Sequence, residues 1–333
     1  MPGLASLVLE PVIGVLGDMG RRRALVLSGG LGFAAALVLA AVAPGFGLLL
    51  GAFLLMFPSS GAFVSLSQAT LMDLAPAMRE RNMARWTLAG SVGVAAGPLL
   101  FLATRSWRWT FVGLAVVALA LTVFVRRLPF DGRGERGGFR TALAALRRRE
   151  VLRWLALLEL QDLGGDVLYG YLALYFVDVV GVSARAAALV VGVWTVSDLV
   201  GNLILLRFLR HVPGTSYVRA TALAVAVLFP LFQLADGLWP KVVLIGLVGA
   251  LHSGWYPVAK GRLYAELPGL SGTAMGISTV TGLLGSALPL AVGLLAGRFG
   301  LHDAFWLVLI APVALLVGVP RASKKGQTGR SDP

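Results

Sequence analysis

Long apolar runs alternate with short polar turns along the chain, and this alternation predicts its secondary structure. A helix needs about 20 mostly apolar residues to cross a bilayer. Runs of this kind recur along almost the whole sequence, and they predict an all-α membrane protein. We predict eleven membrane-spanning helices, at residues 3–17, 24–43, 46–72, 83–103, 108–126, 151–179, 185–208, 218–235, 240–264, 272–297 and 303–320.

Basic residues divide the polar turns into two sets. When successive turns are assigned alternately to the two sides of the membrane, one side holds 24 of the 29 Lys and Arg residues. Positive charge collects in cytoplasmic loops. We therefore expect a multi-pass protein of the cell inner or plasma membrane, with its basic linker and C-terminus in the cytoplasm. This distribution also accounts for the net charge of +13, so we expect no nucleic-acid partner.

The composition argues against an enzyme. The chain has no cysteine and only three widely spaced histidines, so we expect no metal site and no cofactor. An intramembrane enzyme would need a nucleophile–base pair or a set of metal ligands. The sequence contains no HExxH, GxSxG or CxxC motif. We therefore predict that the protein is not an enzyme.

Two halves of the chain are related by an offset of about 193 residues. At this offset Ser60 falls on Ser253 and Asp73 falls on Glu266. Duplicated halves are a known plan of transporters. We predict an N-terminal helical bundle at 1–126, a cytoplasmic linker at 127–150, a C-terminal six-helix bundle at 151–320 and a cytoplasmic tail at 321–333.

The repeat leaves one helix unmatched. The span at 151–179 would need a partner that precedes residue 1. We therefore interpret the chain as a twelve-helix plan without its first helix, because the start site is placed too late or because the form is truncated. A genuine eleven-helix protein is the alternative.

The turn from Gly14 to Leu25, GVLGDMGRRRAL, resembles the signature loop of the major facilitator superfamily. The resemblance covers nearly the whole chain and implies a two-bundle transporter fold. It also implies that Asp18 pairs with the span at 272–297 and latches the outward-open state. Here Met19 replaces a basic residue, and the segment from Asp to Gly is one residue shorter than the family pattern. The expected conformational loop consists of Gly14, Asp18, Gly20, Arg21 and Arg22.

The resemblance implies two further sets of residues. Charge networks at the cytoplasmic ends of equivalent helices hold the gate of such transporters shut, and here they would include Asp73, Arg81 and Glu266. The stretch GSVGVAAGP at 90–98 is similar to an antiporter motif, although Phe101 and Leu102 stand where the family has two glycines. Simple helix packing explains its small residues Gly93 and Gly97 and the bend at Pro98 equally well.

Acidic residues inside a span are costly and indicate function. On the span at 151–179, Glu159, Asp162 and Asp166 fall within about 60° of one another on a helical wheel. We expect them to face a water-filled cavity, where their mutual repulsion favours proton binding. Alternatively, Glu159 pairs with Arg153 or with the linker.

Other polar residues within spans are weaker candidates for the same cavity, and each has a structural alternative. Glu10 could instead be a buried acid that is hydrogen-bonded to a neighbouring helix. Asp198 and Asn202 could form interhelical hydrogen bonds, and aromatic residues on membrane helices often only pack. The additional candidates are Glu10, Asp198, Asn202, His252 and Tyr256.

Together these patterns predict a secondary active transporter that works by alternating access and acts as a monomer. Acids in a cavity with few basic residues favour a proton-coupled exporter of a small amphipathic or cationic molecule. The span from Phe53 to Met72, however, lacks the buried arginine that proton-driven exporters often carry. A sugar or metabolite permease of the same fold, or a truncated non-transporting membrane protein, are the alternatives.

Overall fold

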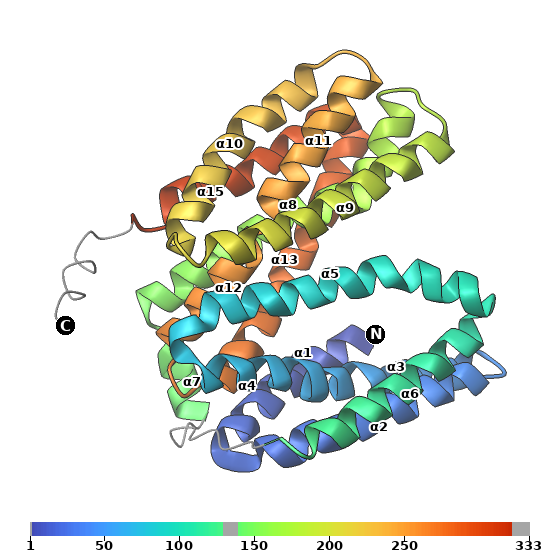
Figure 1. Ribbon diagram of the computed structural model, residues 1–333, viewed down its shortest axis with the longest axis vertical. Helices are drawn as coiled ribbons and strands as arrows, with labels where there is room; N and C mark the ends of the chain where they lie inside the picture. Colours follow the sequence, from blue (N-terminus) through green and yellow to red (C-terminus); the bar gives the residue numbers. More distant parts are fainter. Residues whose placement is uncertain (1, 129–138, 322–333) are drawn as a thin grey trace. The chain divides into compact units, whose positions relative to one another are not determined.

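The computed structural model describes residues 2–128 and 139–321 (Figure 1). Within these ranges the chain forms helices joined by short turns, without any strand. The first part of the chain forms α1 (Pro2–Leu16), the π-helical turn η1 (Gly17–Arg21), α2 (Arg22–Val42), α3 (Phe46–Ser60), the π-helical turn η2 (Gly61–Ser65), α4 (Leu66–Leu74), the 3₁₀ turn η3 (Pro76–Met78), α5 (Arg79–Thr104), α6 (Trp107–Val125) and α7 (Phe139–Ala145).

The remaining helices extend to the end of the described residues. They are α8 (Arg149–Asp178), α9 (Ala184–Phe208), α10 (Gly214–Leu234), α11 (Leu238–His252), α12 (Trp255–Glu266), α13 (Ser271–Phe299), α14 (Leu301–Phe305), the 3₁₀ turn η4 (Trp306–Leu309) and α15 (Ile310–Gly318). Each predicted span coincides with one of these helices or with a consecutive run of them. The all-α fold expected from the apolar pattern is therefore confirmed.

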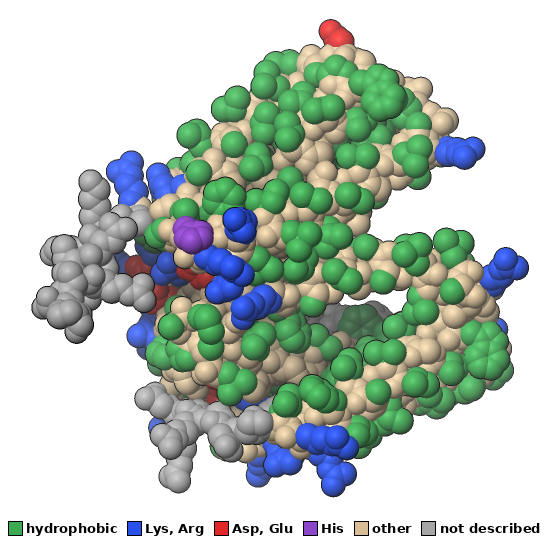
Figure 2. Space-filling view, viewed as in Figure 1, with side chains coloured by type: hydrophobic (Ala, Val, Ile, Leu, Met, Phe, Trp, Pro, Cys, Tyr) green, Lys and Arg blue, Asp and Glu red, His purple; other side chains and the backbone are tan. Residues whose placement is uncertain are grey.

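Helices with apolar outer surfaces support the membrane assignment. Eight helical stretches of the described chain are long and apolar enough to cross a bilayer. In addition, α8 and α13 are 30 and 29 residues long, which is sufficient for a span. Hydrophobic side chains cover the visible faces of α5, α6, α9 and α10 (Figure 2). The protein is thus a multi-pass membrane protein, and the number of eleven crossings stays a prediction.

The chain divides into two compact units. The first contains Met1–Leu155 and Lys260–Ser286, and the second contains Ala156–Ala259 together with Ala287–Pro333. In the first unit α2 packs against α3 and α6, and in the second α11 packs against α9 and α10 (Figure 1). The two predicted bundles, at 1–126 and 151–320, follow from the sequence repeat and have other bounds than these units. The predicted division of the chain stays a prediction.

The first unit joins helices that are far apart in the sequence. Val26 of α2, Phe63 of η2, Leu66 of α4 and Met275 of α13 form one buried hydrophobic cluster. This cluster fixes the beginning of α13 against the N-terminal helices. The polar residues near the α1–α2 turn are held in place by this packing.

Glycines interrupt the helices at informative positions. Gly20 has φ of 90°, a left-handed conformation that glycine adopts without strain, and it makes the tight turn between α1 and α2. Gly61 begins the π-helical turn that separates α3 from α4. Ser253 and Gly254 form the break between α11 and α12. The residues related by the predicted repeat therefore both lie at helix irregularities.

Candidate functional site

The first candidate site is the Asp18 cluster, which we define as Asp18, Arg22, Asp73 and the N-terminal turn of α13 at Ser271–Thr273. The guanidinium of Arg22 donates to Asp18 Oδ1 at 2.8 Å, to Asp73 Oδ2 at 2.7 Å and to Ser271 Oγ at 2.9 Å. Ser271 also donates to Asp73. One buried cation therefore joins two acids that lie 55 residues apart in the sequence.

Asp18 caps the N-terminus of α13. The backbone N–H groups of Gly272 and Thr273 donate to its two carboxylate oxygens at 2.9 and 2.7 Å. The first N–H groups of a helix have no partner within the helix, and the helix dipole favours negative charge at this end. Asp18 is only 2% exposed and Arg22 only 5%, so this capping takes place away from water. The contact with this span is the one that the family resemblance implies.

Small residues allow α1 and α13 to approach each other. A Cβ on Gly14 would collide with the backbone of Gly272, and a Cβ on Gly276 would lie 2.6 Å from the Cα of Pro11. Such close backbone contact between membrane helices is typical of glycine. Gly14, a residue of the predicted conformational loop, thus lies at a position where a larger residue would collide with α13.

A second polar layer follows along the same helices. Thr279 of α13 donates to Glu10 Oε2 at 2.7 Å, and Lys260 donates to Ser278 and interacts electrostatically with Glu10. Tyr264 of α12 donates to Gln68 Oε1 at 2.9 Å. Glu10 therefore hydrogen-bonds to a neighbouring helix, which is the structural alternative considered for it, and its role in a cavity stays a prediction.

The other predicted gating residues have different partners. Arg262 pairs with Glu80, and Arg148 donates to the backbone oxygen of Glu266 at 2.8 Å. Arg21 is exposed. The Nε of Arg81 has no hydrogen-bond partner among the described residues. Their gating roles stay predictions, and the charge network that the structure does form here is centred on Arg22.

The glycines of α5 lie in an open environment. A Cβ at Gly90, Gly93 or Gly97 would meet no atom within 4 Å, and Pro98 is exposed. The packing role predicted for Gly93, Gly97 and Pro98 stays a prediction.

The second candidate site is the α8 polar face of the second unit, which we define as Glu159, Gln161, Asp162, Asp166 and Tyr169 of α8. Asp162 accepts a hydrogen bond from Gln161 and interacts electrostatically with Tyr256. Asp166 and Tyr169 are exposed, whereas Gln161 is fully buried. The predicted stripe of polar side chains therefore exists, and its exposure differs along the helix.

Aromatic side chains surround this face. The rings of Tyr169 and Trp194 meet edge to face with centroids 6.2 Å apart. The ring centroids of Trp194 and His252 are 6.0 Å apart, and those of His252 and Trp255 are 4.9 Å apart. The His252 side chain hydrogen-bonds to the backbone of Gln161. Trp194 and Trp255 are each 1% exposed, whereas Tyr169 is exposed, so the Tyr169 ring is the aromatic face of this group that is open to a cation.

Several predicted cavity residues come together around α8, but not all of them. Asp198 interacts electrostatically with Tyr169, and Asn202 donates to Asp198 Oδ2 at 3.2 Å. Tyr256 lies near Asp162. Glu10 belongs to the first unit. Arg153, the proposed alternative partner of Glu159, pairs with Glu150 one turn away.

Sequence reasoning missed three groups of polar residues. Ser271, Thr273 and Thr279 escaped notice because hydroxyl groups on membrane helices often bond only to their own backbone. Trp194 was not predicted because a lone aromatic in an apolar run gives no signal. Lys241 lies at the beginning of a predicted span and gave no signal of a buried contact, yet it is 7% exposed and donates to Tyr175 Oη and to the backbone oxygens of Phe232 and Gln233.

Comparison with known proteins identifies the class. The family described as Major Facilitator Superfamily matches residues 1–288, and the chain belongs to this family. Its members are membrane transporters of small molecules and not enzymes. The fucose:proton symporter FucP from E. coli has the same fold, with a TM-score of 0.80 at 16% identity, and the match covers 94% of this chain and 86% of FucP.

Two relatives show how far the similarity extends in sequence. Multidrug resistance protein MdtG of Salmonella paratyphi C is 36% identical over 89 residues, which is 26% of this chain and 22% of the length of MdtG. Transcription regulatory protein OpdE of Pseudomonas aeruginosa is 28% identical over 313 residues, which is 88% of this chain and 75% of OpdE. The chain thus matches about a fifth of the length of its MdtG relatives.

Proposed function

We propose that the protein is a proton-coupled exporter of a small cationic or amphipathic molecule, working by alternating access. The observation that carries the proposal is the α8 polar face, where Asp162 and the exposed Asp166 lie on a helix that Trp194 and His252 contact. Carboxylates attract a cation, and aromatic faces bind it. A carboxylate that has released a cation can take up a proton, which couples the two movements.

The Asp18 cluster would serve as the cytoplasmic latch of this transporter. Opening at that end has to separate Asp18 from the N-terminus of α13 and so expose Arg22 and Asp73. Because hydrogen bonds to charged groups contribute about 1.5–3 kcal/mol each, their loss would have to be offset by substrate or proton binding. The turn at Arg21–Arg23, the linker and the C-terminus would lie on the cytoplasmic side of the cell inner or plasma membrane.

The name of MdtG, a multidrug resistance protein, agrees with export, although the match to it is short. FucP, a fucose:proton symporter, represents the alternative of a sugar permease. The name of OpdE, a transcription regulatory protein, names no transported substrate and so agrees with the alternative of a protein that does not transport. A panel of cations, sugars and metabolites, scored by thermal stabilisation of the purified protein, separates the three, because a ligand that binds only the native state raises its apparent stability.

Proteoliposomes with an imposed pH gradient test the mechanism. We expect the wild type to move the stabilising cation against its gradient, and the Asp162→Asn/Asp166→Asn variant to lose at least about tenfold in rate, as expected for removal of a proton-transfer group. Asp178→Asn, which changes an exposed acid at the other end of α8, is the matched control and should transport normally. Unchanged transport by the double variant would contradict the proposal.

A further inference from the structure

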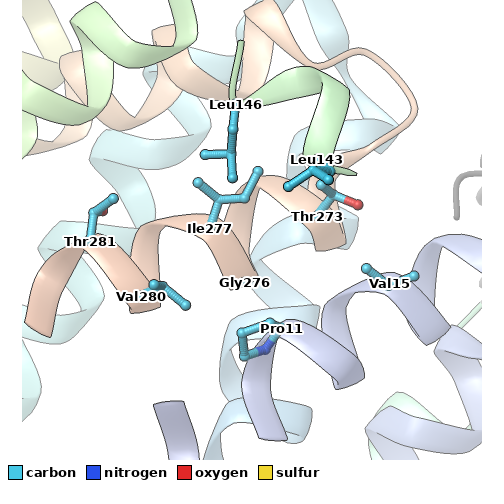
Figure 3. Close-up of a pocket in the computed structure, with 9 residues that line it drawn as sticks. All are labelled: Pro11, Val15, Leu143, Leu146, Thr273, Gly276, Ile277, Val280 and Thr281. Atoms are coloured by element: carbon cyan, nitrogen blue, oxygen red, sulfur yellow. The ribbon is translucent and has the colours of Figure 1, made fainter. Parts of the chain in front are cut away.

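An apolar cavity of about 220 Å³ lies in the first unit between α1, α13 and the part of the predicted linker that contains α7 (Figure 3). Leu143 of α7 and Leu146 just after it point toward Thr273 and Ile277 of α13, and Pro11 of α1 lies on the opposite wall. Thr281, one of the few polar residues in the wall, donates its hydroxyl to the backbone of Ser278. The cavity therefore offers hydrocarbon contact and little else.

The cavity is too small and too apolar to be the binding site of the proposed substrate. Pockets for drug-sized ligands measure about 300–1,000 Å³ and contain a few polar groups that fix the ligand. This cavity is smaller, and no carboxylate lines it. Part of a single hydrocarbon chain suits both its volume and its chemistry.

The segment that closes the cavity is strongly basic. Arg140, Arg147 and Arg149 are exposed on or beside α7, close in sequence to Leu143 and Leu146. Arg148 donates to the backbone oxygen of Glu266 and thereby anchors the segment to α12. Arginine recognises phosphate groups through paired hydrogen bonds. Basic segments beside membrane helices attract the anionic lipids of the cytoplasmic leaflet.

We propose that this cavity binds one acyl chain of an anionic phospholipid whose phosphate is held by Arg147 and Arg149. The chain would extend along α1 and α13, whose contact includes the close approach of Gly276 to Pro11. Thr273, which lines the cavity, also donates its N–H to Asp18. The bound lipid would therefore stabilise the Asp18 cluster. Only this last consequence rests on the proposed latch, because the lipid site itself does not depend on transport.

Native mass spectrometry of the purified full chain tests the site, with dioleoyl phosphatidylglycerol and dioleoyl phosphatidylcholine as probes. We expect the wild type to bind phosphatidylglycerol at least about tenfold more tightly than phosphatidylcholine, a difference that the charge contact would supply. Leu143→Gln/Val280→Gln, at two exposed positions of the lining, should weaken binding of both lipids. Arg147→Gln/Arg149→Gln should remove only the preference for phosphatidylglycerol.

Matched controls lie at the far end of α13. Leu294→Gln and Arg298→Gln change exposed residues of the same types and should leave lipid binding unchanged. Equal binding of the two lipids by the wild type, equal behaviour of lining and control variants, or binding of free oleate as tight as that of phosphatidylglycerol would overturn the proposal. No substrate or gradient is used, so failure of the transport proposal would leave this result intact.

Discussion

The carboxylates of the two candidate sites differ in their burial and in their hydrogen-bond partners. In the Asp18 cluster, Asp18 is 2% exposed and its oxygens accept hydrogen bonds from Arg22 and from two backbone N–H groups. On the α8 polar face, Asp162 lies beside an amide and a tyrosine, and Asp166 is exposed. Buried acids with complete sets of partners hold helices together, whereas accessible acids among aromatic rings can meet a ligand. The contrast supports a stabilising role for the first site, and it agrees with the binding role that we propose for the second.

Removing the central cation of the Asp18 cluster should give the largest effect. Arg22→Met leaves Asp18 and Asp73 without their common partner, and breaking a buried ion pair in this way costs about 3–5 kcal/mol. We expect a marked fall in the thermal unfolding temperature of the purified protein. Arg21→Met is the control, because Arg21 is the neighbouring arginine in the sequence and is exposed. Similar unfolding temperatures for the two variants would show that the cluster contributes little to stability.

Closing the gap between α1 and α13 should give the next effect. Gly14→Ala places a Cβ against the backbone of Gly272, and overpacking of this kind costs about 1–3 kcal/mol. Gly93→Ala introduces the same methyl group where nothing lies within 4 Å, so we expect no loss of stability there. Thermal unfolding of both variants measures the difference. A loss at Gly93 as large as at Gly14 would instead reveal a packing role for α5.

The sequence predicted the helices well, because the length of an apolar run and the charge of its flanking turns reflect the bilayer itself. The turn at Gly20 and the contact between Asp18 and the span at 272–297 were also predictable, the second through a family motif. The common cation was not, because nothing in the spacing of Arg22, Asp73 and Ser271 indicates that three distant segments meet.

The α8 polar face was predictable only in part. A period of 100° per residue places Glu159, Asp162 and Asp166 on one side of a helix. Periodicity does not tell which part of that side is open, nor that Trp194 and His252 would contact it. For Glu10 the same reasoning left two alternatives, and only the contact with Thr279 connects it to a second helix.

A single neutral hydrogen bond should have an intermediate effect. Tyr264→Phe removes the donor to Gln68, which is 8% exposed, and leaving a buried acceptor without a partner costs about 1–3 kcal/mol. Gln68→Leu in the same chain removes the unsatisfied acceptor as well, so the double variant should be more stable than Tyr264→Phe alone. A double-mutant cycle on unfolding temperatures measures this coupling. Additive effects would contradict a direct hydrogen bond between the two side chains.

The smallest effect on stability should come from the α8 polar face. Asp166→Asn preserves the shape of an exposed side chain, and surface substitutions of this kind usually change stability by less than about 0.5 kcal/mol. Asp18→Asn makes the identical chemical change at a site where the carboxylate accepts hydrogen bonds from an arginine and from the N-terminus of a helix. It should therefore lower the unfolding temperature clearly. Because both variants carry the same Asp→Asn change, a difference between their unfolding temperatures in one detergent reports the different surroundings of the two carboxylates. If Asp166→Asn destabilises the protein as much as Asp18→Asn does, the α8 carboxylate is a structural group, and the division between a stabilising site and a binding site fails.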